Sequence, residues 1–177
     1  PGDAIIIPSN QPQTRFLKGL MERVTAFEDS LFYDVSAWTL PLAYGVSSYE
    51  LRRNPSAYIG NKLKPMELSG GSVKGGRAHS AYLLKWNRFY APRALYKILD
   101  SNLFPRLTKA PFSAMVDGEK INFAPGTIVI PVNQRDANSN ISSEEIYKIV
   151  NALAETDHVE IYATNTATTP TGPDLGG

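Results

Sequence analysis

The apolar residues of this chain follow two different spacings. Short runs that are rich in Ile, Val, Leu and aromatic residues, and that end near Pro, Gly or Asn, are typical of strands. They stand at residues 4–7, 31–35, 81–86, 104–108, 128–130 and 159–163. Between them lie segments in which apolar residues recur every three or four positions, the spacing of one helical face. The pattern therefore predicts strands that alternate with amphipathic helices.

Three amphipathic helices follow from this spacing. The first is expected over residues 12–26, and the second begins near Pro92, a residue that suits the first turn of a helix. The third begins after Ser142, which forms a capping box with Glu145 three residues later. The predicted apolar faces consist of Phe16, Leu17, Leu20, Met21 and Val24 in the first helix, Leu95, Ile98 and Leu99 in the second, and Ile146, Ile149, Val150 and Leu153 in the third.

The order Pro-Gly, apolar run, Pro, Asn-Gln occurs twice, at residues 1–11 and again at residues 125–134. A helical pattern follows each copy. An internal repeat of this kind indicates a duplicated structural unit. We therefore expect two equivalent β-α units in one sheet, with four buried side chains at Ile5, Ile7, Ile128 and Ile130.

The alternation of strands and helices indicates the α/β class, with repeated β-α units in a mostly parallel sheet and helices over both of its faces. Asp117-Gly118 stands between two apolar runs at 112–115 and 120–123, and this dipeptide is a strong signal for a hairpin turn. A small antiparallel hairpin is therefore expected before the second repeat copy.

The length of 177 residues favours one domain with a well-buried core, and we expect a single α/β domain over residues 1–163. Residues 53–80 are rich in Gly and lack apolar periodicity, which predicts a flexible insertion loop. Residues 164–177 are small and polar, and we interpret them as an exit linker. Because the chain begins at Pro1 rather than Met, we interpret it as part of a longer protein.

The charge of the chain is nearly balanced, with 18 Lys and Arg against 17 Asp and Glu. No basic field draws the chain to phosphate backbones, so nucleic acid is not an expected partner. No apolar run approaches the roughly 18 to 20 residues that span a bilayer, so no membrane insertion is expected. The sequence contains no cysteine, which excludes disulfides and thiolate chemistry.

We predict no catalytic residue, no metal ligand and no cofactor site. His79 and His158 are the two histidines, and neither has the carboxylate three residues on that a His-x-x-Glu zinc pair requires. The serines lack a Gly-x-Ser-x-Gly context. Residues 70–76 are rich in glycine but lack the Lys-Ser or Lys-Thr ending of a phosphate-binding loop.

Polar and aromatic side chains just beyond the predicted strands form one candidate binding site. Ligands bind outside the carboxyl ends of the strands in open α/β sheets, so these side chains would gather at one edge and bind a small molecule. The alternative is that they form turn and helix-cap hydrogen bonds. The set consists of Asn10, Gln11, Trp86, Asn87, Asn133 and Gln134.

Aromatic and apolar side chains are dense between residues 31 and 44. A strand of ordinary length cannot bury all of them, so some are expected on the surface as a docking face for a neighbouring domain. The alternative is that they belong to the core of this chain. The expected docking residues are Phe32, Tyr33, Trp38 and Leu40.

Residues 27–45, which contain the run Trp-Thr-Leu-Pro-Leu, occur together with characteristic runs at 81–86, 91–95, 125–127 and 172–176. These runs resemble the segment that follows the peptidase domain in large Bacteroidetes-type members of the carboxypeptidase A-like zinc peptidase family. The resemblance implies an accessory domain between the peptidase domain and a class I glutamine amidotransferase-like domain of a periplasmic or extracellular protein. The family's zinc ligands and general-base Glu lie in the upstream domain, so no catalytic residue carries over.

The leading hypothesis is therefore a non-catalytic accessory domain that packs on the peptidase domain of the parent chain or assists substrate binding. Its partners would be neighbouring domains of the same chain. The first alternative is a small-molecule-binding or degenerate amidotransferase-like domain that uses the polar strand ends. The second alternative is a purely structural spacer.

Overall fold

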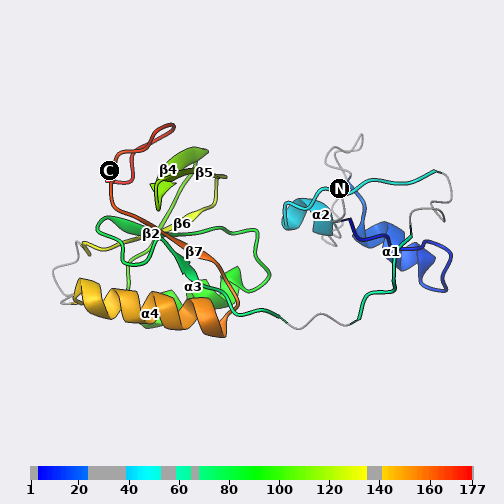
Figure 1. Cartoon of the computed structure of the whole chain (residues 1–177), viewed down its shortest axis with the longest axis horizontal. Helices are drawn as coiled ribbons and strands as arrows, with labels where there is room; N and C mark the ends of the chain where they lie inside the picture. Colours follow the sequence, from blue (N-terminus) through cyan, green and yellow to red (C-terminus); the bar gives the residue numbers. More distant parts are fainter. Residues whose placement is uncertain (1–3, 24–38, 53–58, 65–67, 135–140, 177) are drawn as a thin grey trace, which may run out of the picture. The chain divides into compact units, whose positions relative to one another are not determined.

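The computed structural model describes residues 4–23, 39–52, 59–64, 68–134 and 141–176. The chain divides into two compact units, Pro1–Met66 and Glu67–Gly177, whereas the sequence predicted one domain over residues 1–163. We call them the N-terminal unit and the C-terminal unit and describe each by itself (Figure 1).

In its described residues, the N-terminal unit contains two short helices, α1 (Thr14–Leu20) and α2 (Leu40–Ala43). α1 lies inside the helix predicted over residues 12–26 but is shorter. The Thr14 hydroxyl at its first residue donates to the backbone oxygens of Ser9 and Gln11, which fixes the turn that leads into the helix. The strand predicted over residues 31–35 lies outside the described residues.

The first copy of the sequence repeat forms no strand. Residues 4–7 have no regular structure, and Ile5 and Ile7 are 64% and 50% exposed. The second copy does form a strand, in which Ile128 and Ile130 are buried. The prediction of two equivalent buried units in one sheet is therefore wrong. An apolar run becomes a stable strand only when neighbouring strands pair with it, and within the described part of the chain nothing pairs with residues 4–7.

The C-terminal unit contains a five-stranded sheet in the order β1-β7-β2-β6-β3. A separate two-stranded sheet is formed by β4 and β5, and the described residues of the unit also form two helices, α3 and α4 (Figure 1). The bounds are β1 Val73–Lys74, β2 Ala81–Leu84, α3 Ala91–Asp100, β3 Arg106–Leu107, β4 Phe112–Val116, β5 Glu119–Phe123, β6 Ile128–Pro131, α4 Ser143–Thr156 and β7 Ile161–Thr164.

The sheet is mixed rather than mostly parallel, so the predicted mostly parallel sheet is not found. β1 and β7 run parallel, whereas β7 with β2, β2 with β6 and β6 with β3 are antiparallel. The connections β2-α3-β3 and β6-α4-β7 each join two strands of the same direction, as the alternation of strands and helices predicted. However, β6 lies between β2 and β3, and β2 lies between β6 and β7. This interleaving is the split β-α-β, or ferredoxin-like, arrangement, with β1 added at one edge and the hairpin inserted before β6.

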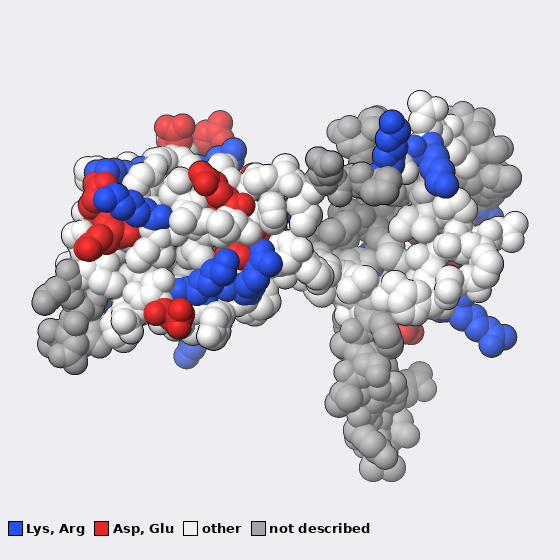
Figure 2. Space-filling view, turned by 90° about the horizontal axis from the view of Figure 1, so that it is seen from below, with Lys and Arg blue, Asp and Glu red and all other residues white. Residues whose placement is uncertain are grey.

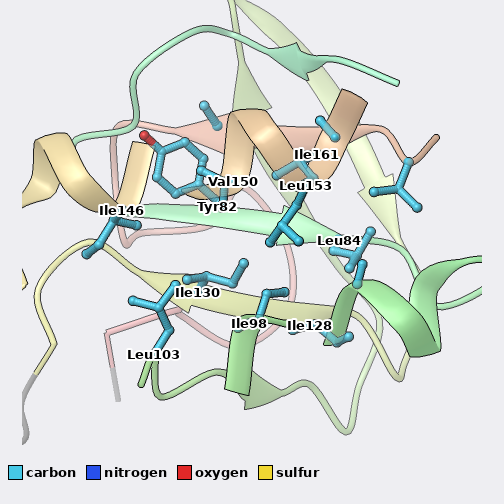
Figure 3. Packing of buried hydrophobic residues seen from close by; sticks show 14 of the residues in the cluster. Tyr82, Leu84, Ile98, Leu103, Ile128, Ile130, Ile146, Val150, Leu153 and Ile161 are labelled. Atoms are coloured by element: carbon cyan, nitrogen blue, oxygen red, sulfur yellow. The ribbon is translucent and has the colours of Figure 1, made fainter. Parts of the chain in front are cut away.

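The larger hydrophobic core lies between the sheet and the two helices, which cover the same face of the sheet (Figure 1). Tyr82 and Leu84 of β2 face this layer together with Ile128 and Ile130 of β6, as Figure 3 shows. The helices contribute Ala94 and Ile98 from α3 and Ile146, Val150, Leu153 and Ala154 from α4.

The opposite face of the sheet is covered by the β4–β5 hairpin instead of a helix. Leu83 and Val129 point to this side, where they join Phe112, Ala114, Val116, Phe123 and Tyr162 in a second core. The hairpin itself is confirmed. Asp117 and Gly118 have φ values of 50° and 80°, and two successive positive φ values define the turn that Asp-Gly favours between strands. Both faces of β2 are therefore buried, which explains four consecutive buried residues.

The helix starts were predicted well. Ser142 and Glu145 form the capping box at the start of α4, and Ile146, Val150 and Leu153 are buried on its inner face. Pro92 lies in the first turn of α3, but this helix buries Ala91, Ala94 and Ile98. Leu99, which follows Ile98 directly and is therefore turned by about 100° from it around the helix, lies off this buried face and is 54% exposed.

Two segments interpreted as loops contribute to the fold of the C-terminal unit. Within the predicted insertion 53–80, β1 pairs with β7, and an added Cβ at Gly71 would lie 2.0 Å from the Val159 oxygen. The tail interpreted as a linker over residues 164–177 begins inside β7. The Ser113 amide then donates to the Thr171 oxygen at 2.9 Å, and Leu175 packs against the second core.

Candidate functional site

The structure does not bring the six predicted strand-end residues together. Trp86 and Asn87 follow β2, where β2 pairs with the beginnings of β6 and β7. Asn133 and Gln134 follow β6, beside the beginning of β2, at the opposite end of the sheet. The prediction assumed parallel strands, whose carboxyl ends share one edge, whereas β2 and β6 are antiparallel. The remaining two, Asn10 and Gln11, belong to the N-terminal unit.

The two glutamines of the repeat make the same local hydrogen bond. Gln11 Nε2 donates to the Pro8 oxygen at 2.9 Å, and Gln134 Nε2 donates to the Pro131 oxygen at 2.6 Å. Gln134 Oε1 also accepts from the Phe104 amide at 2.8 Å. The repeated Pro-x-Asn-Gln order therefore encodes the same turn in both copies. For these two glutamines, the structure agrees with the alternative that they form turn hydrogen bonds.

Of the four predicted docking residues, only Leu40 lies in the described part of the chain. It is the first residue of α2 and is 38% exposed, and its neighbour Leu42 is 41% exposed. Phe32, Tyr33 and Trp38 lie outside the described residues.

The two histidines make contacts that stabilise the fold. The backbone amide of His79 donates to Asn165 Oδ1 at 3.0 Å, and the His158 Nδ1 atom lies 3.1 Å from the Ser69 oxygen. Across the described residues, no group of three or more His, Cys, Asp or Glu side chains is placed to hold a metal ion.

A cluster of interacting polar side chains lies at the end of β2, and it was not predicted. Lys85 directly follows β2, Arg88 stands in the next turn, and Glu160 directly precedes β7. Glu160 Oε2 accepts two hydrogen bonds, from Arg88 Nη2 at 3.1 Å and from the Tyr162 hydroxyl at 3.0 Å. We call Lys85, Arg88, Glu160 and Tyr162 the Lys85 cluster.

The strand register explains why these residues meet. Leu84 pairs with Ile161, so one further step along the antiparallel register places Lys85 opposite Glu160 on the same face. That face carries the second core. The Lys85 Nζ atom lies 4.9 Å from the ring centre of Tyr162 and 5.2 Å from that of Phe123, and the ammonium group therefore rests over two aromatic rings.

Burial and charge shift two pKa values within the Lys85 cluster. Burial lowers the pKa of the Lys85 ammonium, the Arg88 charge lowers it further, and Glu160 acts in the opposite sense. Burial raises the pKa of the Tyr162 hydroxyl, which its hydrogen bond to Glu160 raises further. Titratable groups with shifted pKa values gather at functional sites, and structural ion-pair networks also contain them.

Sequence reasoning missed the Lys85 cluster because its members come from two strands whose pairing was not predicted. Trp86 and Asn87 were singled out, but Lys85 and Arg88 beside them were not. The available signal was a lysine that directly follows a buried apolar run.

No protein-family model, curated protein or solved structure matches this chain. None of the helices in the described residues is long and apolar enough to cross a membrane. Figure 2 shows acidic and basic side chains interspersed over the helix-covered face of the C-terminal unit, without a large area of one sign.

Proposed function

We propose that this chain is a non-catalytic accessory part of a zinc carboxypeptidase-like protein, and that its N-terminal unit packs on the neighbouring peptidase domain. The observation that carries the proposal is the exposure of apolar side chains in this unit. Of its described residues only Pro41 is buried. The exposed large apolar residues are Ile5, Ile7, Phe16, Met21, Leu40, Leu42, Val46, Tyr49, Leu51, Ile59 and Leu63.

Apolar surface of this density is costly in water and is a mark of a protein-binding face. The exposed residues around α2, Leu40 and Leu42, belong to the run over residues 27–45 that carries the resemblance to the peptidase family. The peptidase domain is the neighbour that this resemblance implies, and on the same basis the parent protein is expected in the periplasm or outside the cell. The alternative of a small-molecule site at the polar strand ends gains no support from their positions at opposite ends of the sheet.

The test is calorimetric titration of the chain with the separately expressed peptidase domain of its parent. Replacing two exposed apolar side chains, as in the double variant Leu40→Ser and Leu42→Ser, should weaken binding roughly tenfold or more, because truncating a hot-spot anchor of an interface costs about 2 kcal/mol or more. The matched control is Met115→Ser, a 40% exposed residue on the hairpin of the C-terminal unit, which should leave binding unchanged.

Thermal melts of the same variants separate docking from folding. We expect the double variant to melt as the unchanged chain does, because both leucines are exposed. Unchanged affinity would contradict the docking role. A large loss of melting temperature would also contradict it, because the two leucines would then belong to the core of the chain itself.

A further inference from the structure

The Lys85 ammonium group is partly buried, and Glu160, the carboxylate that attracts it, forms its ion pair with Arg88. The ammonium group lies over the Tyr162 and Phe123 rings, and its surroundings withdraw it from water enough to lower its pKa. Within the described part of the chain, no carboxylate or carbonyl oxygen accepts a hydrogen bond from Lys85 Nζ. An ammonium group carries three N–H donors, and a charged acceptor forms a stronger hydrogen bond with them than a neutral one. An incoming anion would provide such an acceptor.

The charges around Lys85 do not cancel. Glu160 is the one carboxylate of the Lys85 cluster, and it is already engaged by Arg88 and by the Tyr162 hydroxyl. Two cations against one anion leave the cluster with one net positive charge. This excess sits next to aromatic rings, where the local dielectric is lower than in water and electrostatic attraction is correspondingly stronger.

We propose that the Lys85 cluster binds a small monocarboxylate, with Lys85 Nζ as the principal ligand. A single negative charge matches the excess of the cluster. A phosphate dianion would bring a second charge close to Glu160 and be disfavoured. The aromatic floor holds the ammonium group in place, so that little side-chain freedom is lost on binding. This site is separate from the docking role of the N-terminal unit and does not depend on it.

Binding is tested on the full chain by NMR, with lysine labelled at Cε and sodium acetate as the probe. Sodium acetate replaces sodium chloride at constant ionic strength, so that general screening stays fixed. The Lys85 Cε–Hε signal should shift along a saturable curve, whereas exposed lysines such as Lys74 should shift little. The same titration with sodium phosphate should give weaker binding. A linear shift that is common to all lysines, or tighter binding of phosphate, would overturn the proposal.

Two variants locate the acetate site, with the backbone amide of Trp86 as the reporter. Lys85→Met keeps the aliphatic stem over the rings but removes the charge, and it should abolish the saturable shift. The matched control Lys120→Met, on β5 of the hairpin, should keep it. Saturable acetate binding that persists in Lys85→Met would contradict the assignment.

Glu160→Gln provides a test that loss of folding cannot imitate. It removes the single negative charge of the Lys85 cluster and raises the net charge from one to two. Acetate affinity should therefore rise several-fold. If Lys85 acts only as a structural cap on the aromatic rings, acetate affinity will not rise in Glu160→Gln, and that outcome would refute the site.

Discussion

Tyr82 shows how one side chain serves both the core and the backbone of the C-terminal unit. It is 1% exposed in the larger core, and its hydroxyl accepts a hydrogen bond from the Ala78 amide at 3.1 Å. Its ring stacks with that of Tyr147 at a centroid distance of 6.5 Å. The hydroxyl therefore satisfies a buried amide of the segment between β1 and β2, which would otherwise lose a hydrogen bond on folding.

Burial raises the pKa of the Tyr82 hydroxyl above its ordinary value of 10.0, and this shift makes stability depend on pH. The folded state favours the neutral phenol, so its contribution is fully present below pH 10.0 and is lost as the pH rises through the raised pKa. Tyr82→Phe should cost about 1 kcal/mol at neutral pH, because the Ala78 amide loses its acceptor. The difference in stability between the two proteins should narrow above about pH 10.

Denaturant unfolding at pH 7 and at about pH 10.5 measures both effects of Tyr82→Phe. Tyr96→Phe is the matched control, because its side chain is 68% exposed and should unfold as the unchanged chain does at both pH values. A stability difference for Tyr82→Phe that stays constant with pH would contradict the assigned role of burial.

At the scale of elements, the C-terminal tail makes close backbone contacts with β4. Gly172 has a φ of +87°, and an added Cβ would lie 2.5 Å from the Pro111 oxygen and 2.7 Å from the Phe112 Cα. Gly76 has a similar φ of +67°, but an added Cβ there would meet nothing within 4 Å. Both glycines therefore have a positive φ, but only at Gly172 would an added Cβ collide with neighbouring atoms.

We expect Gly76→Ala to cost about 1 kcal/mol, the strain of a left-handed residue with a side chain. Gly172→Ala should cost at least about 1 to 2 kcal/mol more, because the tail must move away from β4 to accommodate the methyl group. Urea unfolding of both variants gives the comparison. Equal losses would show that the tail is not held against the hairpin.

The elements that were predicted correctly depend on local sequence. The capping box of Ser142, Pro92 in the first turn of α3 and the Asp117-Gly118 turn act within a few residues, so the sequence specifies them directly. The repeat was misleading because its two copies share a turn, through Gln11 and Gln134, and differ in whether other strands pair with them. Pairing is set by distant segments, which a local pattern does not report.

The candidate site could be predicted only in part, for the same reason. Trp86 and Asn87 were correctly placed just beyond a strand, but which residues lie beside them in space depends on the strand order. A parallel sheet would have gathered them with Asn133, whereas the antiparallel pairing of β2 with β6 separates them. The same pairing logic, applied to β2 and β7, brings Glu160 to Lys85. The error in strand direction therefore led to the error in the site.

For the whole molecule, the distribution of buried residues predicts that the two units differ in their ability to fold. The buried apolar residues of both cores all lie between Ala78 and Ala163, inside the C-terminal unit. The ion pairs of the buried Asp157 with Arg93 and Lys97 also lie within this unit, where they join the end of α4 to α3. The described part of the N-terminal unit buries only Pro41.

A fragment of residues 67–177 should therefore unfold in one cooperative transition, with a melting temperature within a few degrees of the transition of the full chain. A fragment of residues 1–66 should show no cooperative transition, because its described residues bury only Pro41, and a unit without buried apolar area cannot offset the loss of chain entropy. Calorimetry of the two fragments and of the full chain makes the comparison. A gradual, non-cooperative melt of the 67–177 fragment would show that its two cores require the rest of the chain. A sharp transition in the 1–66 fragment would show that this unit forms a core of its own, and it would remove the observation on which its docking role depends.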